Sequence, residues 1–143
     1  DDIYAIGDCA SQFNRFTGQI MRVESVQNAS DQARITAAHL TGKPLEEPAV
    51  NWFWTDQYSL KIQMAGLLAP GQPIILRGDP HSGAFTLLQM NRQRLTAAFT
   101  VNRPADHMAA RKLIAARADL DRNLMTDPTI PLAKAIAVSA EVG

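Results

Sequence analysis

The chain has 143 residues, which is long enough for one globular domain with a sizeable core. Its 46% hydrophobic and 20% charged content argues against disorder. Fourteen basic and fourteen acidic side chains give no basic excess, so the composition excludes an electrostatic case for nucleic acid. No stretch approaches the ~20 consecutive apolar residues of a membrane-spanning helix, so we expect no membrane segment.

Side chains that could carry chemistry of their own are few. Cys9 is the only cysteine, which excludes a disulfide within the chain, a dithiol pair and a cysteine-rich metal site. A lone cysteine suits a reducing compartment, and we expect a cytoplasmic protein. The three histidines show no metal-ligand spacing with one another or with the carboxylates. We therefore predict no catalytic acid, base or nucleophile, and no metal site.

The first ten residues predict a buried strand that ends in a turn. Ile3–Ile6 is a short apolar run, and Gly7 and Asp8 stop it. Glycine lets a ligand approach the backbone closely, and an aspartate offers two acceptor oxygens to hydroxyl groups. Taken alone, these residues fit a turn-capping aspartate better than a ligand site.

A polar loop is predicted over residues 11–17, and a helix follows the short apolar run 20–23. Ser25 or Asn28 can cap this helix by accepting from its free amides. Its end is predicted at Gly42. Small residues in its apolar stripe suggest close packing against a sheet. The stripe at helical spacing is Val26, Ala29, Ala33, Ala37 and Leu40.

From residue 49 onward the pattern predicts an antiparallel sheet, after a linker at residues 45–48. Apolar and polar residues alternate with a period of two, and turn residues separate the segments. A helix is predicted to begin at Pro104, with Met108, Leu113, Ile114 and Ala115 on its apolar side. The predicted strands and the terminal helix are 58–64, 74–78, 85–90, 95–101 and 132–140. These elements predict an α+β fold with helices at one side of the sheet.

Three segments carry a family resemblance. Residues 3–8, Ile-Tyr-Ala-Ile-Gly-Asp, resemble the second flavin-binding signature of the two-dinucleotide-domain flavoprotein disulfide reductases. Residues 22–29 and the Trp-Phe-Trp-Thr-Asp-Gln-Tyr run at 52–58 resemble the FAD-dependent NAD(P)H:ferredoxin reductases of the putidaredoxin reductase type. The similarity runs from residue 1 to about residue 140. It implies electron transfer from NAD(P)H through FAD to a ferredoxin-type iron–sulfur protein that serves an oxygenase.

The same resemblance implies that the chain is the C-terminal portion of such an enzyme. Residues 1–48 would be a βα segment of the FAD-binding domain. Residues 49–143 would be the reductase C-terminal domain, an antiparallel β-meander with flanking helices. The family's Gly-rich fingerprints lie upstream, and no Gly-x-Gly-x-x-Gly occurs here. We therefore expect this portion to lack FAD and to be inactive alone. We also expect it to self-associate, because residues 3–6 and the helix stripe lose their partners.

The resemblance also implies roles for individual residues. Gly7 and Asp8 would lie beside the FAD, with Asp8 accepting from the ribityl hydroxyls. Val26 would offer its backbone amide to the pyrimidine edge of the flavin, and Trp52 and Phe53 would line the flavin pocket. The competing interpretations are structural: an ordinary capped helix, and tryptophans that anchor a core.

Arg34 and Trp54 are implied to face the ferredoxin. A basic and aromatic surface would steer and dock an acidic partner. Two alternatives stay open. The parent could be a rubredoxin or nitrite reductase component of the same superfamily. The chain could instead be a non-catalytic α+β interaction or dimerisation module.

Overall fold

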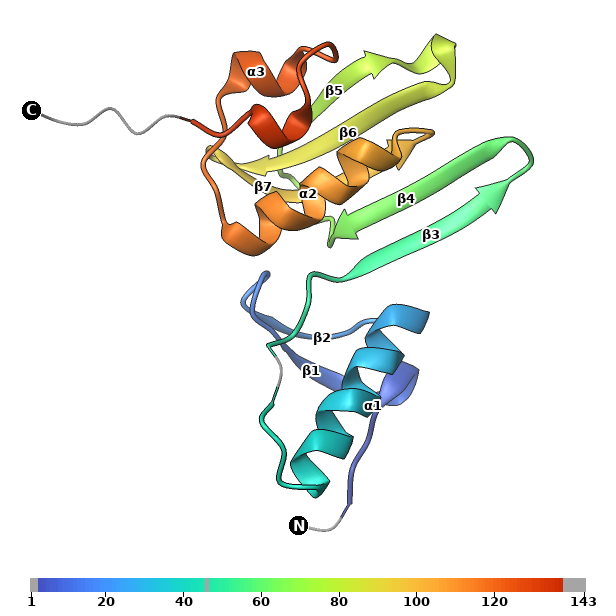
Figure 1. Cartoon of the computed structure of the whole chain (residues 1–143), viewed down its shortest axis with the longest axis vertical. Helices are drawn as coiled ribbons and strands as arrows, with labels where there is room; N and C mark the ends of the chain where they lie inside the picture. Colours follow the sequence, from blue (N-terminus) through green and yellow to red (C-terminus); the bar gives the residue numbers. More distant parts are fainter. Residues whose placement is uncertain (1–2, 46, 138–143) are drawn as a thin grey trace, which may run out of the picture.

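The computed structural model describes residues 3–45 and 47–137, which form two units (Figure 1). The N-terminal unit is a small hairpin beside one helix. The C-terminal unit is a five-stranded sheet with a long helix across one face. Among the helices of these residues, none is both long and apolar enough to cross a membrane.

The N-terminal unit joins two short strands to a capped helix. Its elements are η1 (Gly7–Cys9), β1 (Ser11–Asn14), β2 (Gln19–Arg22) and α1 (Val26–Leu40). The two strands pair antiparallel, with Phe13 opposite Ile20. The Ser25 hydroxyl accepts from the amide of Asn28 at 3.1 Å. Ser25 is therefore the cap, and the predicted helix is confirmed.

Two predictions for this unit are wrong. Residues 3–6 form no strand, and the side chains of Ile3 and Ile6 are exposed. A strand needs neighbours for its backbone hydrogen bonds, and no described segment pairs with residues 3–6. The predicted loop 11–17 instead begins with β1. Asn14 Oδ1 accepts from the amides of Phe16 and Thr17, which turns the chain back into β2.

Helix α1 has its predicted extent but buries the wrong face for its sequence pattern. Its buried side chains are Asn28 and Gln32. Val26, Ala33 and Leu40 of the apolar stripe are exposed instead. Within the part of the chain that the structure describes, no sheet covers this stripe. The packing that the alanines predict is therefore not made here.

The C-terminal unit is built on strands in the order β3-β4-β7-β6-β5, with every neighbouring pair antiparallel. The strands are β3 (Trp52–Gln57), β4 (Leu60–Gly66), β5 (Ile74–Asp79), β6 (Ala84–Asn91) and β7 (Arg94–Val101). The predicted α+β class with an antiparallel sheet is confirmed. The order departs from a simple meander because β4 pairs with β7. The sequence analysis also missed β3 as a strand.

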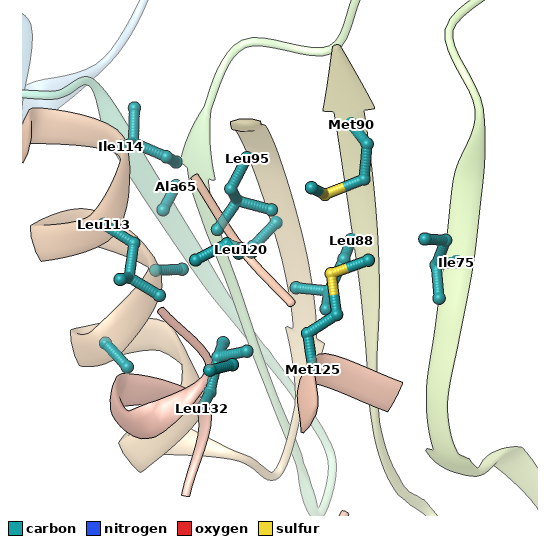
Figure 2. Close-up of a cluster of buried hydrophobic side chains, with 14 of the residues drawn as sticks. Ala65, Ile75, Leu88, Met90, Leu95, Leu113, Ile114, Leu120, Met125 and Leu132 are labelled. Carbon is teal, nitrogen blue, oxygen red and sulfur yellow. The ribbon is translucent and has the colours of Figure 1, made fainter. Parts of the chain in front are cut away.

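The core lies between the sheet and α2 (Pro104–Ala116), whose predicted start is confirmed. Figure 2 shows Leu113 and Ile114 of α2 on the same side of the sheet as Leu95 and Leu88. The predicted apolar positions Met108 and Ala115 are exposed instead, because the inward face of α2 carries other residues. Those inward residues are Asp106, His107, Ala109, Ala110, Leu113 and Ile114.

The chain after α2 closes the same face of the sheet with two short elements, α3 (Arg122–Thr126) and η3 (Leu132–Lys134). The predicted helix 132–140 is wrong over its described part. After η3, Ile136 forms an isolated bridge with Leu120, and residues 138–140 lie outside the described residues. The opposite sheet face exposes Ile74 and Leu68, which border a hollow of about 110 Å³.

A buried arginine ties this closing segment to the sheet. Arg77 on β5 is only 1% exposed, and its Nε donates to Asp106 Oδ2 at 3.0 Å. Its terminal nitrogens donate to the carbonyl oxygens of Met125, Asp127 and Ile130 at 3.1, 2.5 and 2.5 Å. A buried charge is tolerated only when it is paired and hydrogen-bonded. The network therefore fixes where the chain after α3 lies.

Candidate functional site

The N-terminus of α1 presents hydrogen-bond donors to the outside. The Ser25 cap satisfies the amide of Asn28, which leaves the amides of Val26 and Gln27 without a described acceptor. The first turn carries no acidic side chain that would neutralise the positive end of the helix. The Val26 side chain is 68% exposed. This helix end can therefore bind a group that carries or develops negative charge.

Gly7 and Asp8 lie against the first two turns of the same helix. The amide of Gly7 donates to Gln32 Oε1 at 2.6 Å. Gly7 is buried with a φ of 79°, and a Cβ added to it would lie 3.7 Å from the Cβ of Ala29. The Asp8 side chain is exposed. The structure thus packs Gly7 against the helix that begins at Val26, with Asp8 next to it in the chain.

The start of β3 is attached to this helix end. The amide of Trp52 donates to Gln27 Oε1 at 3.3 Å. Trp52 and Trp54 share one face of β3, with ring centroids 5.1 Å apart, and Phe53 points to the other face. Trp52 and Phe53 therefore cannot contact a ligand from the same side of the strand.

Trp52 lies on the helix-covered side of the sheet. Its ring meets the ring of His107 at 5.9 Å and an angle of 61°, and the guanidinium of Arg111 lies 4.9 Å from its centroid. Both partners belong to α2, so the Trp52 ring packs within the C-terminal unit, and its backbone amide bonds to Gln27 of the N-terminal unit. Phe53 is half-buried on the other face. Flavin contact by Trp52 and by Phe53 remains a prediction for each.

Trp54 and Arg34 are the two predicted partner-facing residues. The Trp54 side chain is 47% exposed at the edge strand of the sheet. Arg34 forms an ion pair with Asp31 one turn earlier on α1. Seven residues separate Arg34 from Gln27, which is two helical turns, so both lie on the same face about 10 Å apart along the axis. Because Gln27 bonds to the backbone amide of Trp52, Arg34 lies about two helical turns along α1 from the start of β3.

His107 is a titratable group that the sequence analysis did not single out. Burial lowers the pKa of His107 from its usual value of 6.5, and the charge of Arg111 lowers it further. Neither ring nitrogen has a hydrogen-bond partner among the described residues. An imidazole without a partner cannot relay a proton. We therefore assign His107 a packing role beneath Trp52.

Asn51 and Gln27 connect the parts of the site, and the sequence analysis gave neither a role at this site. Asn51 is buried and bonds to Asn14 and Asn28. Polar amides near a helix start are usually solvated or capping residues, so no sequence signal distinguishes these. Residues 3–45 and 47–137 hold no cluster of three or more potential metal-ligating side chains.

Comparison with known proteins relates both units to reductases of ferredoxin-type proteins. Residues 52–136 match the family described as Reductase C-terminal. The ferredoxin reductase subunit of the 5,5'-dehydrodivanillate O-demethylase from Sphingobium sp. is 42% identical over 92% of this chain and 32% of its own length. The rhodocoxin reductase of Rhodococcus erythropolis is 44% identical over 96% of this chain and 32% of its own length.

The fold is also that of a solved reductase complex. The covalent putidaredoxin reductase–putidaredoxin complex matches with a TM-score of 0.84 and 38% identity, over 89% of this chain and 30% of that chain. The chain therefore spans about a third of the length of the curated relatives it matches.

Proposed function

The chain belongs to the reductase C-terminal family, and we propose that it forms the C-terminal part of a flavoprotein reductase. The whole protein would carry electrons from NAD(P)H through FAD to a ferredoxin-type iron–sulfur protein, and would serve an oxygenase in the cytoplasm. We propose a boundary at residue 48 between a segment of the FAD-binding domain and the reductase C-terminal domain. The names of the relatives, which are ferredoxin and rhodocoxin reductases, support this assignment.

One observation supports the function most directly: Gly7, the neighbour of Asp8, packs against the first turns of α1, and the start of β3 bonds to the same end of the helix. This arrangement fits one edge of a flavin. The amides at Val26 and Gln27 suit the negative charge that builds on the pyrimidine edge during reduction. The exposed carboxylate of Asp8 can accept from ribityl hydroxyls. Bound FAD would supply hydride acceptance and one-electron transfer.

The chain offers only part of a cofactor site. It contains no Gly-x-Gly-x-x-Gly turn that could bring the backbone close to a pyrophosphate. The exposed stripe of α1 and the exposed side chains of Ile3 and Ile6 have no partner in the described chain. We propose that the remainder of a longer protein covers them and completes the FAD site. In the isolated chain, self-association would cover the same apolar surfaces.

The partner surface would be Trp54 together with the face of α1 that carries Arg34. A cationic side chain beside an exposed tryptophan suits an acidic protein partner. Neither residue needs to react, because the two cofactors would perform the chemistry. The role of these residues would be to hold the partner's cluster close to the flavin.

The test compares the 143-residue chain with the longer protein that contains it. The longer protein should retain FAD and reduce a [2Fe-2S] ferredoxin with NADH or NADPH, and the chain alone should do neither. Asp8→Asn in the longer protein should weaken FAD retention about tenfold, since a charge-assisted hydrogen bond becomes a neutral one. A longer protein that binds no flavin would contradict the proposal and favour an interaction module. Reduction of rubredoxin but not ferredoxin would reassign the acceptor.

A further inference from the structure

Buried amide side chains join the hairpin, helix α1 and the start of β3. Asn14, Asn28 and Asn51 come from these three parts, and all three are buried. Asn14 Nδ2 donates to Asn51 Oδ1 at 2.7 Å, and Asn51 Nδ2 donates to Asn28 Oδ1 at 3.5 Å. Asn28 Nδ2 then donates to the carbonyl oxygen of Val23 at 2.8 Å. One chain of hydrogen bonds therefore runs from the hairpin turn to the first turn of α1.

The backbone around Asn51 is fixed as well. The amide of the next residue, Trp52, donates to Gln27 Oε1 at 3.3 Å. The carbonyl oxygen of Asn51 accepts from the amide of Gly66 at 2.8 Å. Gly66 has a φ of 73°, and a Cβ there would lie 2.1 Å from the carbonyl oxygen of Thr96. Asn51 thus bonds through its side chain to the N-terminal unit and through its backbone to the end of β4.

We propose that Asn51 is a positioning residue, whose side-chain amide sets the Trp52–Trp54 strand relative to the N-terminus of α1. This inference rests on the proposed function. In that function the α1 N-terminus holds the flavin edge, and Trp54 faces the partner. Asn51 lies three residues before Trp54 and bonds to Asn28, two residues after Val26. Its amide therefore links the cofactor side to the partner side.

Hydrogen bonds suit this task because they constrain direction as well as distance. Without the Asn51 amide, Asn14 Nδ2 would be buried without its acceptor, and the strand start would shift or admit water. The helix end itself would stay in place, since the Ser25 cap and the bond from Gly7 to Gln32 are untouched. A displacement near 1 Å between reacting partners can lower a rate by up to about 100-fold. Electron delivery to the partner should therefore suffer more than flavin reduction.

The experiment uses the longer protein with Asn51→Ala, Asn14→Ala and a control, Gln89→Ala. Gln89 is also a buried amide, and its side chain bonds to the backbone of Ala69 at 2.8 and 2.9 Å, away from α1. Flavin reduction by the nicotinamide is followed in a stopped-flow instrument. Ferredoxin reduction is followed at steady state, to separate kcat from KM.

Asn51→Ala should lower kcat for ferredoxin about five- to tenfold and leave the flavin-reduction rate within about twofold. Asn14→Ala should act in the same direction through the bond that it shares with Asn51, although it also removes the acceptor of the Phe16 and Thr17 amides. Asn51→Asp keeps the acceptor for Asn14 but loses the donor to Asn28, so it should lower kcat as well. Gln89→Ala should leave both rates within about twofold.

Two results would overturn the inference: an unchanged kcat in Asn51→Ala, or an equal fall in both rates. If Asn51→Ala does not fold, Asn14→Ala tests the same bond from its other end. If the wild-type protein reduces no ferredoxin, the proposed function fails instead. The positioning role then remains testable in the 143-residue chain, where Asn51→Ala should speed hydrogen exchange of the Trp52 amide at least about fivefold. An unchanged exchange rate there would also overturn the inference.

Discussion

The two units of this chain differ in how completely they bury their apolar side chains. Between its sheet and α2, the C-terminal unit encloses apolar residues such as Leu88, Leu113 and Leu132. The N-terminal unit encloses the amides of Asn28 and Gln32 and exposes the apolar stripe of α1. A unit that buries polar side chains and exposes apolar ones presents a surface suited to binding another protein surface. We therefore expect the sheet unit to depend on its own core and the N-terminal unit to depend on a further protein surface.

The difference has a functional consequence. The groups assigned to the cofactor, Asp8 and the α1 amides, belong to the unit that is incomplete. Strand β3 pairs with β4 in the unit with its own core, and its start bonds to Gln27 of the N-terminal unit. A cofactor site formed where these two units meet would be complete only when the missing surface is present.

The largest expected effect is in the C-terminal unit. Arg77→Ala removes a buried guanidinium that bonds to Asp106 and to three backbone carbonyl oxygens. The loss of one member of a buried ion pair costs about 3–5 kcal/mol of unfolding free energy. Chemical denaturation of the 143-residue chain, compared with the Arg77→Ala variant, measures this loss of unfolding free energy. Arg122→Ala, at an exposed position on α3, is the control and should change the free energy by less than about 0.5 kcal/mol. A loss below about 1 kcal/mol in Arg77→Ala would contradict the account.

A smaller effect is expected inside the N-terminal unit. Asn28→Ala deletes the donor to Val23 and the acceptor for Gln12 and Asn51. Leaving such partners buried and unsatisfied costs about 1–3 kcal/mol. The loss should be local, so hydrogen exchange should accelerate in α1 and in the hairpin but not in β6 or β7. Equal acceleration in both units would mean that they unfold together, and the comparison would fail.

Acidification should weaken the C-terminal unit through His107. Its pKa is lowered in the folded protein from the usual 6.5, so below about pH 6.5 the unfolded chain binds a proton that the folded chain does not. Stability attributable to this group is complete above pH 6.5 and falls as the pH drops toward the folded-state pKa. For one titrating group, the free energy of unfolding cannot change by more than about 1.4 kcal/mol per pH unit. Chemical denaturation gives the free energy of unfolding at pH 5.5 and at pH 7.5. The difference between the two values should be smaller in His107→Phe than in the wild type. An identical difference would rule out a titrating His107.

The smallest effect in this chain should come from the α1 stripe. Ala33 is exposed, so Ala33→Glu should change the stability of the 143-residue chain by less than about 0.5 kcal/mol. In the longer protein the same charge would be buried at the proposed contact and should lower FAD retention markedly. Ala115→Glu, the same change at an exposed position of α2 in the C-terminal unit, is the matched control. Full FAD retention in Ala33→Glu would mean that the stripe stays in solvent.

Elements that carry their own pattern could be predicted from the sequence. Leu60, Ile62 and Met64 alternate with polar residues, which predicts a strand, and the structure has β4 at these residues. Pro104 marks the start of α2 because proline suits a first helical turn. The strand predicted at residues 3–6 failed because a strand is defined by neighbours that the described chain does not contain.

The site was only partly predictable for a similar reason. Gly7, Asp8 and Val26 matched a family motif, and the structure packs Gly7 against the helix that begins at Val26. Asn51 and Gln27 had no such signal, because an amide's role depends on what it meets in three dimensions. Arg77 was missed for the same reason: nothing in the Ile-Ile-Leu-Arg-Gly run indicates that its arginine is buried.

The measurement that tests the central claim most directly is hydrogen exchange of the 143-residue chain beside the longer protein, at equal pH and temperature. The account predicts equal protection of β6, β7 and α2 in both. It predicts that residues 3–8 and the first turns of α1 become strongly protected only in the longer protein, and more so with FAD bound. Equal protection of residues 3–8 and α1 in both proteins would show that the N-terminal unit is already complete, and would contradict the account.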